Sequence, residues 1–120
     1  MYTREELKAI VNKAILNITF EDGADRLYEP VKYILSMGGK RLRPVMSLMA
    51  CNLFSDSIDH AIVPSVGLEV FHNFTLVHDD IMDRSALRRG SETVHKRWND
   101  SQAILSGDVM AFVANDCIAQ

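Results

Sequence analysis

The longest helical pattern in the sequence runs from Pro64 to Asp83, and it constrains the class of fold. Apolar residues recur there at helical spacing over about 20 residues, which is roughly 30 Å of α-helix. Helical repeats bounded by proline and glycine fill most of the remaining chain, and no segment alternates apolar and polar residues as a strand does. Because 48% of the 120 residues are hydrophobic, the chain can bury one core. We therefore expect an all-α fold.

Shorter helices are predicted from their caps and breaks. Thr3 and Glu6 form a capping box before an amphipathic helix, which the segment FEDGADRL interrupts. A second helix is expected to begin near Pro30 and to end at the glycine pair 38–39. Pro44 is expected to open a third helix, and SDSIDHAI to form a turn before the longest one.

The C-terminal third is predicted to be a polar loop followed by a helix. RSALRRGSETVHKRWND should hold at most a short helix, and Ser101 is the expected N-cap of the segment QAILSGDVMAFVANDCIAQ. This last helix remains apolar on one face at Ala119 and has no stop signal. An apolar helix face needs a further element to cover it. We therefore expect residues 1–120 to be the N-terminal portion of a larger domain.

Composition excludes several classes of function. The net charge is −3, so no overall basic field favours a nucleic acid partner. No apolar run reaches the roughly 20 residues of a membrane span. The two cysteines, Cys51 and Cys117, have no metal or redox spacing, and the amphipathic N-terminus is unlike a signal peptide. These features predict a cytoplasmic protein.

Three aspartates close the longest helix. Asp79 and Asp83 lie one turn apart on one face, and Asp80 lies about 100° round from Asp79. Like charges at this spacing repel, and the C-terminal end of a helix disfavours negative charge. Oxygen ligands without a soft partner suit Mg²⁺, which takes one or two carboxylates together with substrate phosphates. The alternative is a solvated acidic helix end.

Two groups of cations flank these acids in the sequence. Lys40, Arg41 and Arg43 follow a glycine pair at which the backbone can approach a ligand, and Arg88 and Arg89 follow the aspartates. Arginine and lysine both bind phosphate oxygens. Either group alone would be read as solvated surface. Taken together with the aspartates, they describe a site for a Mg²⁺-bridged diphosphate and a second anion.

The segments GGKRLRP, HDDIMD, RRG and AILSGD resemble the trans-type isoprenyl diphosphate synthases, the polyprenyl synthetase family, in order and spacing. The resemblance implies the isoprenoid synthase fold, in which long antiparallel helices surround a central cavity, and a homodimer. It implies head-to-tail condensation of isopentenyl diphosphate with an allylic diphosphate. Relatives are well over twice as long and carry a second aspartate-rich motif. We therefore expect residues 1–120 alone to be inactive.

The resemblance also implies a role for each matching residue. Asp79 and Asp83 would bind Mg²⁺ bridged to the allylic diphosphate, with Asp80 in support. Arg88 would contact that diphosphate. The diphosphate of isopentenyl diphosphate would be held by four residues: Lys40, Arg43, His72 and Arg89. His72 shares the helix face of Asp79, although an isolated histidine of this kind is more often a core residue.

Residues before the first aspartate are expected to set product length. Phe71, Phe74 and Thr75 lie one to two turns before Asp79 and could line an apolar pocket, although phenylalanines at helical spacing are usually core. A bulky residue at the Phe74 position resembles the members with shorter products. The resemblance therefore implies a product of about 15 to 20 carbons, a range taken from the family and not from the helix geometry.

Three other interpretations remain at this stage. Two Glu-x-x-His pairs, Glu69 with His72 and Glu92 with His95, match the di-iron motif of carboxylate helical bundles, but the second pair falls in the polar loop. A non-catalytic subunit of a heteromeric synthase would keep the fold but would not need the aspartates. A class I terpene cyclase would share the aspartates but would not need a second diphosphate site.

Overall fold

The computed structural model describes residues 1–20 and 23–120, which form six α-helices and one short antiparallel hairpin. In chain order these are α1 (Arg4–Leu16), α2 (Asp25–Ser36), α3 (Leu42–Phe54), α4 (Asp59–Asp83), β1 (Leu87–Arg88), β2 (Ser91–Glu92), α5 (Val94–Arg97) and α6 (Asp100–Ala119). The expectation of an all-α fold is confirmed, and the two-residue strands are its one exception among the described residues.

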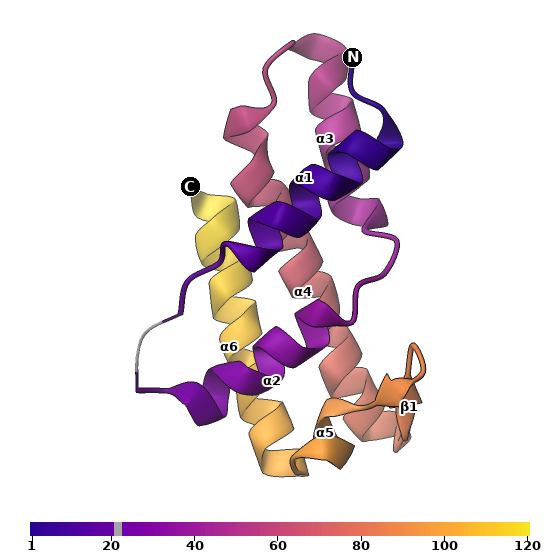
Figure 1. Cartoon of the computed structure of the whole chain (residues 1–120). Helices are drawn as coiled ribbons and strands as arrows, with labels where there is room; N and C mark the ends of the chain where they lie inside the picture. Colours follow the sequence, from indigo (N-terminus) through magenta and orange to yellow (C-terminus); the bar gives the residue numbers. More distant parts are fainter. Residues whose placement is uncertain (21–22) are drawn as a thin grey trace.

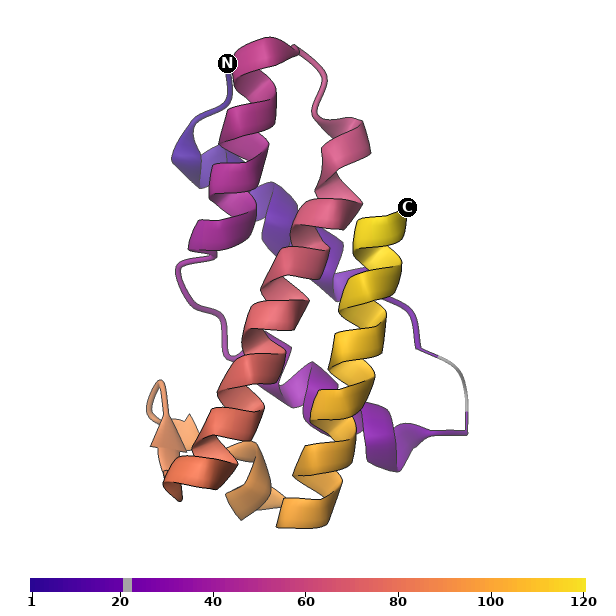
Figure 2. The same ribbon diagram turned by 180° about the vertical axis from the view of Figure 1, so that it is seen from behind.

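The helices form two layers. Helices α3, α4 and α6 lie side by side, with α4 and α6 antiparallel, and α1 and α2 cross one face of this layer (Figures 1 and 2). The core lies between the layers and receives side chains from all six helices. Fully buried members include Leu7, Val11, Val31, Ile34, Leu48, Val70 and Met110. The hairpin and α5 lie at the C-terminal end of α4 (Figure 1).

Helices α4 and α6 approach each other closely at two glycines. A Cβ atom at Gly67 would lie 2.9 Å from both the Ala114 carbonyl oxygen and the Cys117 Cβ. A Cβ atom at Gly107 would overlap the His78 ring, whose Nε2 lies 3.2 Å from the Ile104 carbonyl oxygen. The close contact between α4 and α6 therefore requires glycine at both positions, one near each end of the contact.

Two predicted helix starts were wrong. Helices α2 and α4 begin at Asp25 and Asp59, and Pro30 and Pro64 lie inside them. A proline removes its own N–H and disturbs one turn, but packing of the remaining helix can offset this cost. Pro30 is itself fully buried in the core. Only the first half of SDSIDHAI is therefore non-helical.

The other predicted boundaries fared better. The capping box is confirmed by hydrogen bonds of 3.1 Å in both directions between Thr3 and Glu6. Helix α1 ends before FEDGADRL, whose Glu21 and Asp22 lie outside the described residues. Helix α2 ends ahead of the glycine pair 38–39, as predicted, and Pro44 lies in the first turn of α3.

The region after α4 differs most from the prediction. The loop contains the hairpin β1–β2, in which Leu87 pairs with Glu92. Its turn residues Arg89 and Gly90 have φ values of 51° and 79°, as a type I′ turn requires. Helix α6 is capped by Asn99 and not by Ser101, because the Asn99 side chain accepts a 2.8 Å hydrogen bond from the Gln102 N–H.

Several large apolar side chains are exposed on the layer of α3, α4 and α6. They include Met46, Leu53, Phe54, Leu68, Phe71, Met82, Leu105 and Phe112. Surface of this kind is typical of contacts with further protein or with a ligand. In the part of the chain that the structure describes, no helix combines the length and the apolar character that crossing a membrane requires.

Candidate diphosphate-binding site

The turn between α2 and α3 is built from left-handed backbone. Gly38, Gly39 and Arg41 have φ values of 79°, 126° and 55°. A Cβ atom at Gly39 would lie 3.2 Å from the guanidinium carbon of Arg89, so glycine also leaves room for this side chain. The turn therefore lies against the Arg89 side chain of the hairpin that follows α4.

A pocket of about 410 Å³ opens where this turn meets α4 and the hairpin. Four of the residues around it are those predicted to hold one diphosphate: Lys40, Arg43, His72 and Arg89. They come from three segments that are far apart in the sequence. Leu42, Glu69, Gly39 and Arg41 complete the lining. We call this cavity the basic pocket.

The basic pocket favours an anion. Burial, followed by the positive charge of Arg43, lowers the pKa of His72 below its ordinary value, and Arg89 and Arg88 act in the same direction. Burial, followed by the charge of Arg88, also lowers the pKa of Arg89. Both shifts report crowded positive charge that is partly removed from water. A bound anion would relieve that repulsion.

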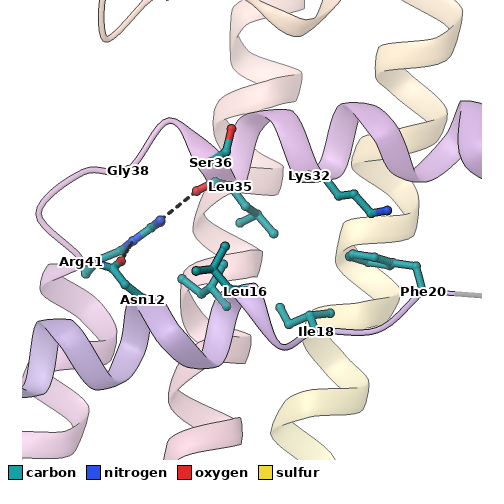
Figure 3. A pocket seen from close by; sticks show the side chains of 10 residues that line it. Asn12, Leu16, Ile18, Phe20, Lys32, Leu35, Ser36, Gly38 and Arg41 are labelled. Carbon is teal, nitrogen blue, oxygen red and sulfur yellow. Dashed lines mark hydrogen bonds between the residues drawn. The ribbon is translucent and has the colours of Figure 1, made fainter.

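Arg41 does not have the role that its place in the cationic cluster suggested. Its side chain is buried, and its Nη1 donates a 2.8 Å hydrogen bond to Glu69 Oε2. Its Nε donates to Asn12 Oδ1 at 2.9 Å, and its Nη2 donates to the Leu35 carbonyl at 2.8 Å (Figure 3). Arg41 therefore connects α3 to α1, α2 and α4.

The three aspartates separate into two kinds. Asp79 and Asp83 are exposed near the end of α4, and neither has an ion-pair partner within the described residues. Asp80 is buried, and its two oxygens accept hydrogen bonds of 2.8 and 2.9 Å from Arg88. The pair Asp79–Asp83 is called the acidic pair below.

No group of three potential metal-ligating His, Cys, Asp or Glu side chains forms among residues 1–20 and 23–120. The acidic pair therefore brings together two carboxylates, and the third, Asp80, is bonded to Arg88. This geometry is also unlike a di-iron centre. Glu69 is bound to Arg41, and Glu92 lies exposed on β2 while His95 is buried.

The residues predicted to set product length lie on successive turns of α4. The rings of Phe71 and Phe74 meet edge to face with centroids 5.4 Å apart, and Phe74 meets His78 in the same way at 4.9 Å. Phe71 is 46% exposed, whereas Phe74 packs against the core. The Thr75 hydroxyl donates a hydrogen bond of 2.6 Å to the His72 carbonyl.

The hairpin joins the two halves of the site. Its consecutive residues Arg88 and Arg89 have side chains directed to different places, the first to Asp80 and the second to the basic pocket. Sequence reasoning missed this arrangement because strands of two residues leave no alternating pattern. The usable signal was the Arg-Gly pair, since glycine favours the positive φ of a two-residue turn.

The all-α layer thus carries the acidic pair at the C-terminal end of α4 and the basic pocket beside the middle of the same helix. A model of the polyprenyl synthetase family matches residues 24–120. The chain belongs to the polyprenyl synthetase family, and its helices correspond to the N-terminal part of the isoprenoid synthase fold. This assignment excludes the di-iron bundle considered above.

Relatives of known activity support the assignment. A geranylgeranyl pyrophosphate synthase of Geoglobus acetivorans is 42% identical over 101 residues, covering 84% of this chain and 32% of the relative. A farnesyl diphosphate synthase of Micrococcus luteus is 36% identical over 111 residues, covering 91% of this chain and 38% of the relative. The chain thus spans about a third of the length of these curated relatives.

Solved structures agree with the sequence matches. A crystal structure of a geranylgeranyl pyrophosphate synthase superposes with a TM-score of 0.93 at 43% identity, covering 98% of this chain and 36% of the other. A heptaprenyl diphosphate synthase of Staphylococcus aureus superposes with a TM-score of 0.79 at 30% identity, covering 96% and 35%. The named relatives thus include synthases of both short and long products.

Proposed function

We propose that the chain forms the substrate-binding N-terminal part of a prenyltransferase that joins isopentenyl diphosphate to an allylic diphosphate. The observation that carries this proposal is the hairpin, which holds Arg88 and Arg89 between the acidic pair and the basic pocket. A reaction between two diphosphates needs two anion sites at a fixed separation. The hairpin, in which Arg88 and Arg89 are consecutive, provides that separation.

The basic pocket is assigned to isopentenyl diphosphate. Lys40 supplies a point charge, and Arg43 and Arg89 supply planar donors that match phosphate oxygens. His72 is partly buried beside these arginines and gains a hydrogen-bonding role once an anion balances their charge. All four residues line the same pocket, so that one diphosphate could contact them together.

The acidic pair is assigned to the metal-bridged allylic diphosphate. Two exposed carboxylates that have no ion-pair partner among the described residues fit Mg²⁺, which prefers oxygen and commonly takes one or two carboxylates. When bound, Mg²⁺ would supply positive charge where the leaving diphosphate becomes more negative. Asp80 orients Arg88 through two hydrogen bonds, so that the remaining N–H groups of Arg88 can meet the same diphosphate.

The reaction then needs no protein nucleophile. The allylic C–O bond breaks, and diphosphate leaves with the electron pair. The double bond of isopentenyl diphosphate attacks the resulting cation, and the condensed cation loses a proton to the released diphosphate. Phe71, Phe74 and Thr75 would form an apolar wall along the growing chain. Exclusion of water by such a wall protects a reactive cation, and its bulk is consistent with a product of about 15 to 20 carbons, as the family resemblance implies.

The remaining properties of the whole protein are part of the proposal. We infer that residues 1–120 are the N-terminal portion of one polyprenyl synthetase domain, and that the enzyme is a cytoplasmic homodimer. The length of the relatives supports the first point. An acidic pair with no partner in the described chain favours a catalytic subunit over a non-catalytic one.

Titration calorimetry on this chain tests the two sites separately. Isopentenyl diphosphate should bind without metal, and Arg43→Ala should weaken binding about 10-fold or more, as loss of a charged hydrogen bond implies. A non-hydrolysable allylic diphosphate analogue should bind only with Mg²⁺, and Asp79→Ala should weaken this Mg²⁺-dependent binding. Asp116→Asn, an exposed acid on α6, is the control. Metal-independent binding of the analogue, or an unchanged Asp79→Ala variant, would contradict the proposal.

A further inference from the structure

We propose that Arg41 is a positioning residue whose function is to neutralise Glu69, which would otherwise place a negative charge in the lining of the basic pocket. The inference rests on the proposed function, because it takes the basic pocket as the site of a diphosphate. Sequence reasoning placed Arg41 among the anion-binding cations and gave Glu69 no role in this site. The structure joins the two residues.

Glu69 is an unusual residue for an anion site. It lies on α4 one turn before His72, is only 3% exposed, and lines the same pocket as Lys40, Arg43 and Arg89. Its negative charge acts to raise the pKa of both His72 and Arg89, against the larger effects that lower them. An unpaired carboxylate here would compete with a diphosphate for the same cations.

Arg41 is held in an orientation in which its guanidinium group pairs with Glu69 and is not free to bind a ligand. Its guanidinium group is bound on three nitrogens, to Glu69 and, as Figure 3 shows, to Asn12 and to the Leu35 carbonyl. Its backbone has a φ of 55°, a left-handed conformation that is unfavourable for a residue with a side chain. Buried hydrogen bonds from three other elements offset this strain. The arrangement is built into the fold.

The consequence is a defined charge balance. With Arg41 in place, Glu69 is neutralised, and the pocket is lined by the positive charges of Lys40, Arg43 and Arg89. Without Arg41, the Glu69 carboxylate would repel a diphosphate across a few ångströms of partly dehydrated space, where charges interact strongly. Without Glu69, Arg41 would contribute an additional uncompensated positive charge behind the pocket.

Binding of inorganic pyrophosphate without metal, measured by calorimetry on the whole chain, tests this inference. Glu69→Gln should lower the stability of the chain but raise its affinity for pyrophosphate by about 3-fold to 10-fold, because only the electrostatic effect acts on binding. Arg41→Met should lower affinity by about 10-fold or more. The double variant, a near-isosteric neutral pair, should recover most of that loss.

The controls distinguish this inference from the proposed function. Arg84→Met removes an arginine whose partner is the exposed Asp100, outside the pocket, and should leave affinity unchanged. If Arg43→Ala also leaves affinity unchanged, both the proposed function and this inference fail. If Arg43→Ala weakens binding but Glu69→Gln does too, the inference alone is wrong, since a purely structural pair would lower stability and affinity together. Should Arg41→Met not fold, the single Glu69→Gln variant and the double variant still decide the question.

Discussion

Removing Arg88 should destabilise the chain more than removing the charge of its partner Asp80. The two side chains form a bidentate ion pair, but they are buried to different degrees. The Asp80 side chain is 5% exposed, whereas the Arg88 side chain is 26% exposed. Arg88→Met would leave a buried carboxylate without a partner. Asp80→Asn would leave a guanidinium group that can still reach water and an amide that can still accept a hydrogen bond.

The expected magnitudes follow from this asymmetry. Leaving a buried charge unpaired typically costs about 3 to 5 kcal/mol, so Arg88→Met should cost at least about 3 kcal/mol. Asp80→Asn should cost about 1 to 2 kcal/mol, the value of hydrogen bonds to a charged group. The double variant should cost less than the sum, with a coupling energy of about 1 to 2 kcal/mol.

Urea unfolding followed by circular dichroism measures these differences. Arg84→Met provides the matched control, because its ion pair with Asp100 is exposed and should contribute less than about 1 kcal/mol. A larger cost for Asp80→Asn than for Arg88→Met would refute the reasoning. Additive costs in the double variant would also refute it. Either result would mean that Asp80 faces solvent or a ligand instead of holding Arg88.

Two further predictions concern the helix contact and the basic pocket. Gly107→Ala should lower the free energy of unfolding by about 1 to 3 kcal/mol in the same assay, because its Cβ would overlap the His78 ring; an unchanged value would contradict the close approach of α4 and α6. Because the folded chain holds the pKa of His72 below its unfolded value, the unfolded state takes up a proton first, and stability should fall as pH drops through the ordinary histidine pKa. His72→Gln should reduce this loss of stability at low pH. Separately, pyrophosphate should raise the pKa of His72 in an NMR titration of the wild-type chain. A His72 pKa that does not respond to pyrophosphate would argue against anion binding beside His72.

The sequence was most informative where a residue acts locally. The capping box of Thr3 and Glu6, the break at the glycine pair and the shared face of Asp79 and Asp83 all follow from helical spacing. Pro30 and Pro64 misled the prediction because packing elsewhere along a helix can outweigh one lost hydrogen bond. The hydrophobic periodicity of the sequence does not show whether packing along a helix outweighs the hydrogen bond lost at a proline.

Tertiary pairing was beyond the reach of the sequence. Residue type and spacing in GGKRLRP do not distinguish Arg41, which turns inward, from Lys40 and Arg43, and only the family resemblance left Arg41 out of the diphosphate ligands. The same is true of Asp80 among the three aspartates, because its direction depends on an arginine presented by a hairpin eight residues later. The residue types in the sequence predicted which side chains lie near one another. Only the folded structure shows which of them line the site and which hold those residues in place.

The central claim is that Asp79 and Asp83 bind a divalent ion that also contacts a diphosphate. Crystals of the chain grown with Mn²⁺ and a non-hydrolysable allylic diphosphate analogue test it most directly, because Mn²⁺ gives an anomalous signal and shares the oxygen preference of Mg²⁺. The account predicts an anomalous peak between these two carboxylates, with the diphosphate directed toward Arg88. An anomalous peak elsewhere, or these carboxylates engaged in ion pairs with protein side chains, would contradict it.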